Sequence, residues 1–328
     1  MKIYRNHCCC TKLLKFQSSY ELQTPILGKV FLDVVNNINK NVNGVQLKPR
    51  GPDGYVPILE TENAMKDGTL DCAFTGLSYS FLQNSFYELY TSVPFGIKGD
   101  AYISYLFEKG GIENLNKEAR KDGLFMYPMC LLPPETGGWF PKEIKSIDDF
   151  KDITIRIYGL GRNILENLGA KTVFLPQTSI IPSLKNGTIN AVEFSTIEID
   201  ASLGLPENIN YWYTPSWNQL STVLYFVINL KKWESLTEEQ RNLMKLLMKE
   251  NMYSNYISSN TNQIDFLEKY KSQLRVFPKE VLKAIRESWF QWLNKPGNEQ
   301  TKEEFERIKE YSIKYYAYDD IMGIGIIG

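Results

Sequence analysis

The 328-residue sequence predicts an α/β fold with two lobes, each a mostly parallel sheet flanked by helices, and a long helix that crosses both lobes. Three observations support this fold class. Strand-like and helix-like segments alternate twice in the same order, and the two series share a short sequence motif. The chain becomes continuously helical after residue 228. A doubled α/β architecture explains their joint occurrence better than chance does.

The first series begins at Leu13 with a short apolar run, followed by an amphipathic stretch at 25–41. A strand at 45–48, a helix at 57–66 and a strand within GTLDCAF (68–74) follow. This order is β-α-β-α-β, and it predicts a parallel sheet with crossover helices.

The second series begins at Ile153, where isoleucines alternate with Thr154, Arg156 and Tyr158 in the period of a half-buried strand. Helices are expected in GRNILENLGA (161–170) and IIPSLKNG (180–187), and strands in KTVFLP (171–176) and TINAVEF (188–194). MKDGTLDCAF (65–74) and LKNGTINAVE (184–193) match position by position, with glycine where a helix ends in a left-handed residue.

The C-terminal part is expected to be helical. A Ser/Thr cap with acidic residues in the first turn predicts a helix that starts after Trp233 and runs to about residue 273. Two amphipathic segments follow at 279–293 and 301–316, and they are interpreted as cover or dimer surface. We expect 12–126 plus 219–250 to form the first lobe, and 127–218 plus 251–328 to form the second lobe with the C-terminal helices.

Composition excludes several classes of protein. Lys plus Arg total 37 against 38 acidic residues, so the charge of −1 gives no basic surface for nucleic acid. No stretch reaches the roughly 18 to 20 apolar residues of a membrane span. The five cysteines include the triplet Cys8 to Cys10, which has neither CxxC spacing nor a histidine beyond His7 and does not read as a disulfide framework.

Arg156 stands where a strand should bury apolar surface. Gly159 and Gly161 resemble the start of a dinucleotide fingerprint, but Ile164 replaces its third glycine, so a nucleotide phosphate is not the obvious partner. Ligands of open parallel sheets bind at the carboxyl ends of the strands, where Arg156 and Glu193 are both expected. Arg156 either binds a carboxylate with its two-pronged guanidinium or pairs with Glu193 as a structural bridge, and the sequence leaves both open.

Two further clusters carry polar and aromatic groups. PPETGGWFPKEI (133–144) places Glu135 before two glycines and the pair Trp139-Phe140, and NYWYTPSWNQLST (210–222) surrounds Pro215 with aromatic residues and amides. Each cluster alone also fits a turn or strand with core aromatics.

Taken together, these clusters resemble the substrate-binding subunits of tripartite ATP-independent periplasmic (TRAP) transporters, in the branch that binds 2-oxo and 2-hydroxy monocarboxylates. The resemblance covers most of residues 13–260. It rests on SVPFGI (92–97), YLFEKGGIENL (105–115), ETGGWFPKEI (135–144), TIRIYGLGRNILENLGAK (154–171), SLKNGTINAVEF (183–194) and YTPSWNQ (213–219). It implies a periplasmic-binding-protein-like clamshell that closes on one small acid such as pyruvate or lactate.

The resemblance also implies roles for individual residues. Arg156 matches the arginine that binds the substrate carboxylate, and the other substrate-binding positions are Glu135, Trp139, Glu193, Phe194, Trp217 and Tyr79. A calcium or sodium ion that bridges substrate and protein would be held by Glu135, Glu193, the Phe194 carbonyl and Gln219.

Three positions depart from the family pattern. Glu135 replaces a glutamine, Phe194 replaces a tryptophan, and Gln219 ends a motif in which a glutamate is usual. Arg156 brings one positive charge, while Glu135, Glu193 and the substrate carboxylate bring three negative ones. A divalent cation makes this sum zero and sodium leaves one negative charge buried, so we expect calcium, or else a protonated Glu135.

The family acts outside the cytoplasmic membrane and works with TRAP membrane subunits, so the resemblance implies a periplasmic protein. Residues 1–11 lack the apolar core of an export signal and are interpreted as an anomalous leader. A homodimer through the C-terminal helices is left open.

Two other functions also fit parts of the sequence. An enzyme on the same fold would need a base for the nucleophile Cys130, and His7 is the only histidine; the carboxylate pair Glu135 and Glu193 could instead support acid/base chemistry. The second rival is the same receptor with a sugar acid, a dicarboxylate or sialic acid as its ligand.

Overall fold

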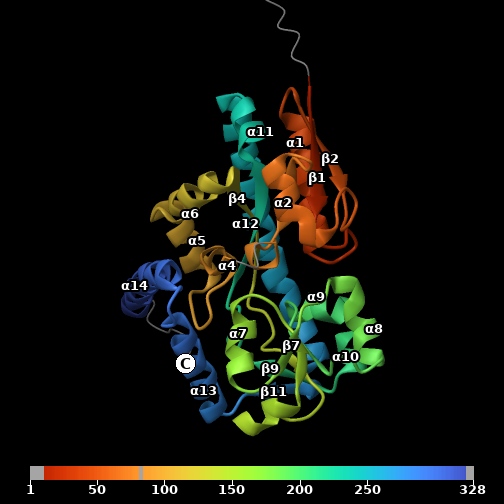
Figure 1. The fold of residues 1–328 in the computed structure, drawn as a ribbon, viewed down its shortest axis with the longest axis vertical. Coiled ribbons are helices and arrows are strands. Elements are labelled where there is room, and N and C mark those ends of the chain that lie inside the picture. Colours follow the sequence, from red (N-terminus) through yellow and green to blue (C-terminus); the bar gives the residue numbers. More distant parts are fainter. Residues whose placement is uncertain (1–10, 81–83, 323–328) are drawn as a thin grey trace, which may run out of the picture.

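The computed structural model describes residues 11–80 and 84–322, in two lobes stacked along the long axis of the molecule (Figure 1). The expectations for His7 and for Cys8 to Cys10 lie outside these residues. An α/β fold with two mostly parallel sheets and a long helix is confirmed.

The first lobe is built on a five-stranded sheet in the order β2-β1-β3-β10-β4. β10 runs antiparallel to both of its neighbours, and the other strands are parallel to one another. The strands are β1 (Lys12–Ser18), β2 (Val45–Arg50), β3 (Cys72–Thr75), β4 (Leu124–Leu132) and β10 (Thr222–Asn229). The helices of this part are α1 (Leu27–Asn41), α2 (Thr61–Asp67), α3 (Leu77–Ser80), α4 (Ser85–Thr91), α5 (Gly99–Glu108), α6 (Gly111–Ala119) and α11 (Leu230–Ser235), with 3-10 turns η1 (Ile58–Glu60) and η2 (Arg120–Asp122).

The second lobe contains a six-stranded sheet in the order β11-β9-β5-β8-β6-β7, in which only β5 is antiparallel. Its strands are β5 (Trp139–Phe140), β6 (Thr154–Arg156), β7 (Lys171–Val173), β8 (Ala191–Val192), β9 (Tyr211–Thr214) and β11 (Leu274–Val276). Its helices are α7 (Leu160–Asn167), α8 (Ile180–Lys185), α9 (Ile197–Ser202), α10 (Leu205–Asn208) and α13 (Lys279–Leu293), with 3-10 turns η3 (Ile147–Asp152), η4 (Gln177–Ser179) and η5 (Lys271–Gln273).

The sequence motif shared by 65–74 and 184–193 corresponds to a repeated structure. Gly68 after α2 and Gly187 after α8 have φ of 84° and 76°, the left-handed values that end a helix and favour glycine. The strands that follow, β3 and β8, each lie beside the first strand of their own series, β1 and β6. The order 2-1-3 therefore occurs in both sheets, and it brings the carboxyl ends of β6 and β8 together.

Helix α12 (Glu238–Lys269) links the two lobes. It begins at a capping box in which Thr237 and Gln240 exchange side-chain-to-backbone hydrogen bonds, as the capping signal predicts. The helix packs against α1 and β4 of the first lobe and against α9 of the second. In the second-lobe contact, Gln263 Nε2 donates to Glu198 Oε2 at 3.0 Å.

The C-terminal helix α14 (Glu299–Met322) differs from its predicted place. We expected it in the second lobe, but it packs on α4 and α5 of the first, while α13 packs on α7 of the second. The reason is the buried Glu304, which accepts hydrogen bonds from the Tyr90 and Tyr105 hydroxyls at 2.8 and 2.6 Å and from Asn114 Nδ2 at 2.6 Å. The boundary expected at residue 126 also falls inside β4, so we now propose that the first lobe keeps all of this strand.

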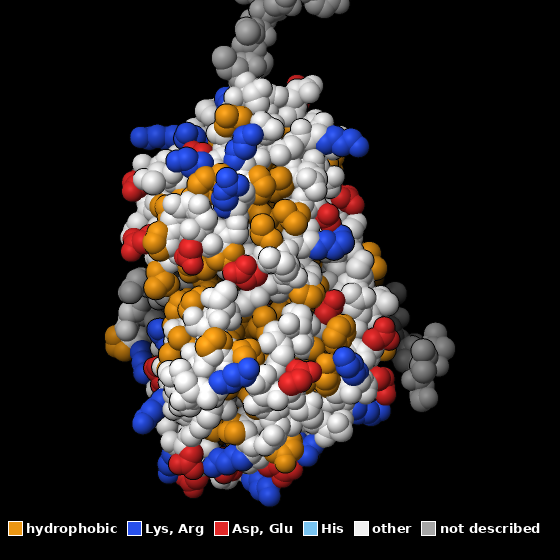
Figure 2. All heavy atoms as spheres, turned by 90° about the vertical axis from the view of Figure 1, so that its right-hand side faces the viewer, with side chains coloured by type: hydrophobic (Ala, Val, Ile, Leu, Met, Phe, Trp, Pro, Cys, Tyr) orange, Lys and Arg blue, Asp and Glu red, His pale blue; other side chains and the backbone are white. Residues whose placement is uncertain are grey.

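Side chains from the two lobes are in direct contact. The ring of Tyr79 lies 5.1 Å from the rings of both Tyr158 and Phe174, and Gln177 Nε2 donates to Thr24 Oγ1 at 2.6 Å. Figure 2 shows hydrophobic side chains gathered across the middle of one face, with lysine, arginine and acidic side chains interspersed above and below. Within the described ranges, no helix has the length and apolar character to cross a membrane.

Glu88 on α4 is a buried carboxylate at this lobe boundary. Its Oε2 has no hydrogen-bond partner among the residues described, and it lies 3.6 Å from the place a Cβ would take at Gly159, just before α7. Burial raises the pKa of Glu88 from 4.5 to about 8, an increase that the positive charge of Arg162 on α7 partly opposes. Between these two pH values the folded protein therefore binds more protons at this site than the unfolded chain.

Glu88→Gln is expected to flatten the dependence of stability on pH. The parent protein should lose up to about 1.4 kcal/mol per pH unit from this group as pH rises from 4.5 to 8, because ionisation is easier in the unfolded chain. The variant keeps a neutral side chain throughout and should lose less. Thermal unfolding midpoints at pH 5 to 9 measure the difference, with the exposed Glu108→Gln as a control that should follow the parent. Parallel curves for Glu88→Gln and the parent would refute this effect.

Candidate functional site

Arg156 ends β6 and is completely buried. Its Nε donates to the Leu175 carbonyl at 3.1 Å, and its Nη1 donates to the Glu193 carbonyl at 2.8 Å. The rings of Tyr158 and Phe194 each lie 4.8 Å from the guanidinium carbon. Two main-chain oxygens and two aromatic faces therefore fix the guanidinium plane.

The third nitrogen, Arg156 Nη2, finds no hydrogen-bond partner in the described part of the chain. The sequence left open a side-chain ion pair between Arg156 and Glu193. In the described part of the chain Arg156 instead donates to the main-chain carbonyl of Glu193. A buried cation with a free donor is the arrangement expected for binding an anion, because an unsatisfied buried donor costs about 1 to 3 kcal/mol.

Glu135, Glu193 and Gln219 converge beside Arg156. Gln219 Nε2 donates to Glu135 Oε2 and to Glu193 Oε1, both at 2.7 Å, and the Thr222 hydroxyl donates to Glu135 Oε1 at 2.6 Å. The loop 133–138, β8 and the segment before β10 supply these groups. One amide nitrogen thus stands between two carboxylates whose negative charges would otherwise face each other.

Both carboxylates are strongly perturbed. Burial, and then the neighbouring Glu193, raises the pKa of Glu135 well above its usual range. Burial also raises the pKa of Glu193, against hydrogen bonding from Gln219 and the charge of Arg156. Two buried acids that share one donor favour a positive partner or a retained proton.

The donor set fits a hard cation. Glu193 Oε2 is buried and has no partner within the residues described, and rotation of the Gln219 amide would present its oxygen between the two carboxylates. Among these residues no cluster of three or more His, Cys, Asp and Glu side chains forms a metal site, so the remaining ligands must be amide or main-chain oxygens. The contacts of Phe194 involve its ring, and the role of its carbonyl stays a prediction.

A small cavity lies between the lobes at this point. Its lining includes Tyr20, Leu27, Leu132 and Leu224 from the first lobe, and Tyr158, Phe194 and Ser195 from the second. Glu135 and Thr222 also reach it. Its volume of about 10 Å³ leaves room for about one water molecule, so the lobes are close together.

The other predicted site residues lie around this cavity and do not line it. Trp139 is buried behind it, with its Nε1 donating to Asp200 at 2.8 Å, and Trp217 Nε1 donates to the Gly137 carbonyl at 3.2 Å. Tyr79 packs on Tyr158 across the lobe boundary. These contacts make the two tryptophans supports of the site loops, and their predicted place in the pocket wall stays a prediction.

Asp200 on α9 is a site residue that the sequence analysis missed. It accepts hydrogen bonds from Trp139 Nε1, from the Thr136 hydroxyl at 3.0 Å and from the Ser195 amide at 3.0 Å. This one carboxylate ties together the loop after Glu135 and the loop after Glu193. Tyr20 and the leucines of the first lobe were missed as well, because nothing in their local sequence marks residues that meet Arg156 only in the folded chain.

Cys130 is an improbable nucleophile. It is buried in β4, and desolvation raises the pKa of its thiol. The thiolate that such chemistry needs is therefore disfavoured.

Comparison with known proteins matches residues 55–295 to the model of family 7 of the bacterial extracellular solute-binding proteins. A curated relative from Nostoc sp., a monocarboxylate 2-oxoacid-binding periplasmic protein, is 26% identical over 294 residues, which cover 88% of this chain and 81% of the relative.

Solved structures agree with this match. A TRAP periplasmic solute-binding protein from Colwellia psychrerythraea, with bound calcium and pyruvate, has a TM-score of 0.88 at 25% identity, covering 95% of this chain and 97% of that one. A TRAP periplasmic solute-binding protein from Pseudoalteromonas atlantica, with bound sodium and pyruvate, has a TM-score of 0.89 at 23% identity and the same coverage.

Asp200→Asn is expected to destabilise the protein by about 2 to 4 kcal/mol, because an amide places a donor against groups that are themselves donors. Urea unfolding monitored by tryptophan fluorescence measures the change. The exposed Asp152→Asn, which disturbs only a surface ion pair with Lys142, should stay within about 0.5 kcal/mol of the parent. Equal unfolding free energies for Asp200→Asn and the parent would show that these contacts do not support the site loops.

Proposed function

Because this chain belongs to family 7 of the bacterial extracellular solute-binding proteins, in which the TRAP receptors fall, we propose that it captures a small monocarboxylate in the cleft between its lobes. The ligand is a 2-oxo or 2-hydroxy acid such as pyruvate or lactate, and the receptor delivers it to TRAP membrane subunits from outside the cytoplasmic membrane. The names of the Nostoc relative and of the Colwellia complex support this ligand class.

The observation that carries the proposal is the free donor of Arg156. Nη2 is buried and without a partner in the described structure, and Nη1 lies beside it, so the ligand carboxylate would share this edge of the guanidinium with the Glu193 carbonyl. The carboxylate supplies the negative charge that the buried cation lacks.

The first-lobe side of the cavity favours a monocarboxylate over the rival ligands. Leu27, Leu132 and Leu224 present only apolar surface to the cavity, which is also lined by Tyr158 and Phe194, the two rings beside Arg156. A second carboxylate or a row of sugar hydroxyls would lose its hydration there without gaining partners. A short aliphatic side chain fits this wall.

A cation completes the proposed site. Glu135, Glu193 and Gln219 would hold it, and when bound it would neutralise the two carboxylates and attract the oxygen atoms of the ligand. Relatives contain calcium or sodium. We favour calcium because two charges balance Glu135, Glu193 and the ligand against Arg156, whereas sodium requires a protonated Glu135.

Lobe closure follows from the distribution of these groups. Arg156 and Glu193 belong to the second lobe and the leucines to the first, so only a closed cleft surrounds the ligand. The segments that cross between the sheets would provide the hinge, and the membrane subunits would recognise the closed form. A homodimer through the C-terminal helices remains a prediction; it would have to use the outer face of α14, where Tyr318 is exposed, since the inner face covers α4 and α5.

Removal of the Arg156 guanidinium tests whether this group binds the ligand carboxylate. Arg156→Ala should eliminate the thermal stabilisation that pyruvate or lactate gives, which for the parent amounts to about 2.7 kcal/mol at a ligand concentration of 100 Kd. Each variant is compared with its own unliganded midpoint, so a loss of intrinsic stability does not confound the result. The surface variant Arg275→Ala should keep the full shift. An undiminished shift in Arg156→Ala would refute the assignment.

Dialysis against a calcium chelator tests the divalent cation. Affinity for the acid should fall at least about tenfold, as the loss of one charged interaction of about 1.4 kcal/mol or more implies. Isothermal titration before dialysis, after it and after calcium is restored measures the effect. Unchanged affinity throughout would exclude a divalent ion as the bridging group.

An exchange of two side chains tests which residues hold the cation. Glu135→Gln should weaken acid binding about tenfold or more by removing one carboxylate. Glu135 and Gln219 are in contact, so the double variant Glu135→Gln/Gln219→Glu moves the carboxylate without changing the charge and should recover most of the loss. Full affinity in the single variant, or no recovery in the double variant at restored calcium, would contradict the proposed ligand set.

A further inference from the structure

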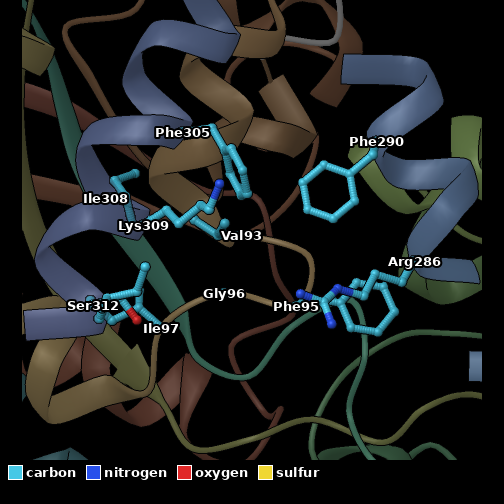
Figure 3. Close-up of a pocket in the computed structure, with 11 residues that line it drawn as sticks. Val93, Phe95, Gly96, Ile97, Arg286, Phe290, Phe305, Ile308, Lys309 and Ser312 are labelled. Carbon is cyan, nitrogen blue, oxygen red and sulfur yellow. The ribbon is translucent and has the colours of Figure 1, made fainter. Parts of the chain in front are cut away.

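A second cavity lies outside the cleft, between α13, α14 and the loop 93–97 (Figure 3). Its volume is about 200 Å³, and it shares no lining residue with the cavity at Arg156. Phe95, Phe290 and Phe305 supply aromatic walls, and Val93 and Ile308 add aliphatic surface. The space is smaller than the roughly 300 to 1,000 Å³ of common ligand pockets, so it admits a short chain or a single ring.

The charged groups of this cavity are of one sign. Arg286 and Lys309 are among its lining residues, and no acidic side chain is. The Arg286 guanidinium carbon lies 5.8 Å from the centre of the Phe290 ring, and no ion pair of Arg286 occurs within the described ranges. Lys309 Nζ lies 5.8 Å from the centre of the Phe305 ring and pairs with Glu306 at 2.9 Å on the exposed side of α14. Apolar walls and an available guanidinium are complementary to a ligand that is apolar at one end and anionic at the other.

The cavity stays open because the elements around it are anchored to different parts of the fold. α13 is held on the second lobe and α14 on the first, so the two helices diverge from the turn that joins them. The loop 93–97 closes the bottom of the gap, fixed by the Phe95 amide, which donates to the Trp217 carbonyl at 2.8 Å. Three anchored elements thus surround an apolar space that none of their side chains fills.

We propose that the α13–α14 cavity binds a short amphiphilic carboxylate, with its apolar chain or ring against the wall that Phe95, Phe290 and Phe305 form and its carboxylate at Arg286. The occupant is an acid of greater apolar surface than the ligand of the cleft. This site is independent of the function proposed for Arg156, since the two cavities have separate walls.

Hexanoate, hexylamine and hexanol are matched probes of this site. Titration by ligand-observed NMR should give saturable hexanoate binding, and hexylammonium should bind at least about tenfold more weakly, because it meets two cations of its own sign. Hexanol, which keeps the chain and lacks the charge, should fall between them.

Variants test whether hexanoate binds in the α13–α14 cavity. Arg286→Glu, at an exposed position, should weaken hexanoate binding about tenfold or more, and Ser312→Trp, at the half-buried edge of the cavity, should reduce it by obstruction. Lys314→Glu on the same helix, outside the cavity, should change it little, and Arg156→Ala should leave it unchanged. No saturable hexanoate binding by the parent, equal binding of hexylammonium, or binding lost in Arg156→Ala and kept in Arg286→Glu would each overturn the proposal.

Discussion

The buried guanidinium of Arg156 is the constraint on which the rest of the site depends. A cation at the end of a strand in a folded core requires oxygen acceptors, and the chain provides two carbonyls from the neighbouring strand and loop. One nitrogen is left over. The surrounding groups follow from this: two aromatic rings against the guanidinium, carboxylates nearby that lower the cost of the positive charge, and the first lobe, which covers the site. The same arrangement makes the unliganded site incomplete and an acid its natural complement.

The carboxylates beside Arg156 are held in place by hydrogen bonds from neighbouring side chains. The resemblance to the TRAP receptors implies a glutamine at position 135 and a glutamate at position 219, and here Glu135 and Gln219 are hydrogen-bonded to each other. An exchange between contacting positions leaves the number of carboxylates unchanged. We therefore propose that these two departures are one compensated change. Asp200 adds a third buried carboxylate, which is satisfied entirely by donors of the site loops and serves to hold them.

Much of the fold was predictable because it is encoded locally. Period-2 alternation, glycines at helix ends and the capping box at Thr237 are properties of neighbouring residues, and the repeat fixed the order of strands in both lobes. Arg156, Glu135, Glu193 and Gln219 were found through motifs, and the structure brings all four together. The place of α14 was not predictable, because it depends on Glu304 meeting tyrosines about 200 residues away. For the same reason Asp200 and the leucines of the first lobe could not be recognised.

The central claim is that a ligand carboxylate completes the hydrogen bonding of Arg156. A crystal structure of the protein grown with pyruvate and calcium tests this most directly. A carboxylate oxygen should lie within about 3 Å of Arg156 Nη2, with the methyl group toward Leu132 and Leu224. A carboxylate bound elsewhere, or Nη2 satisfied by a protein side chain in the complex, would contradict it.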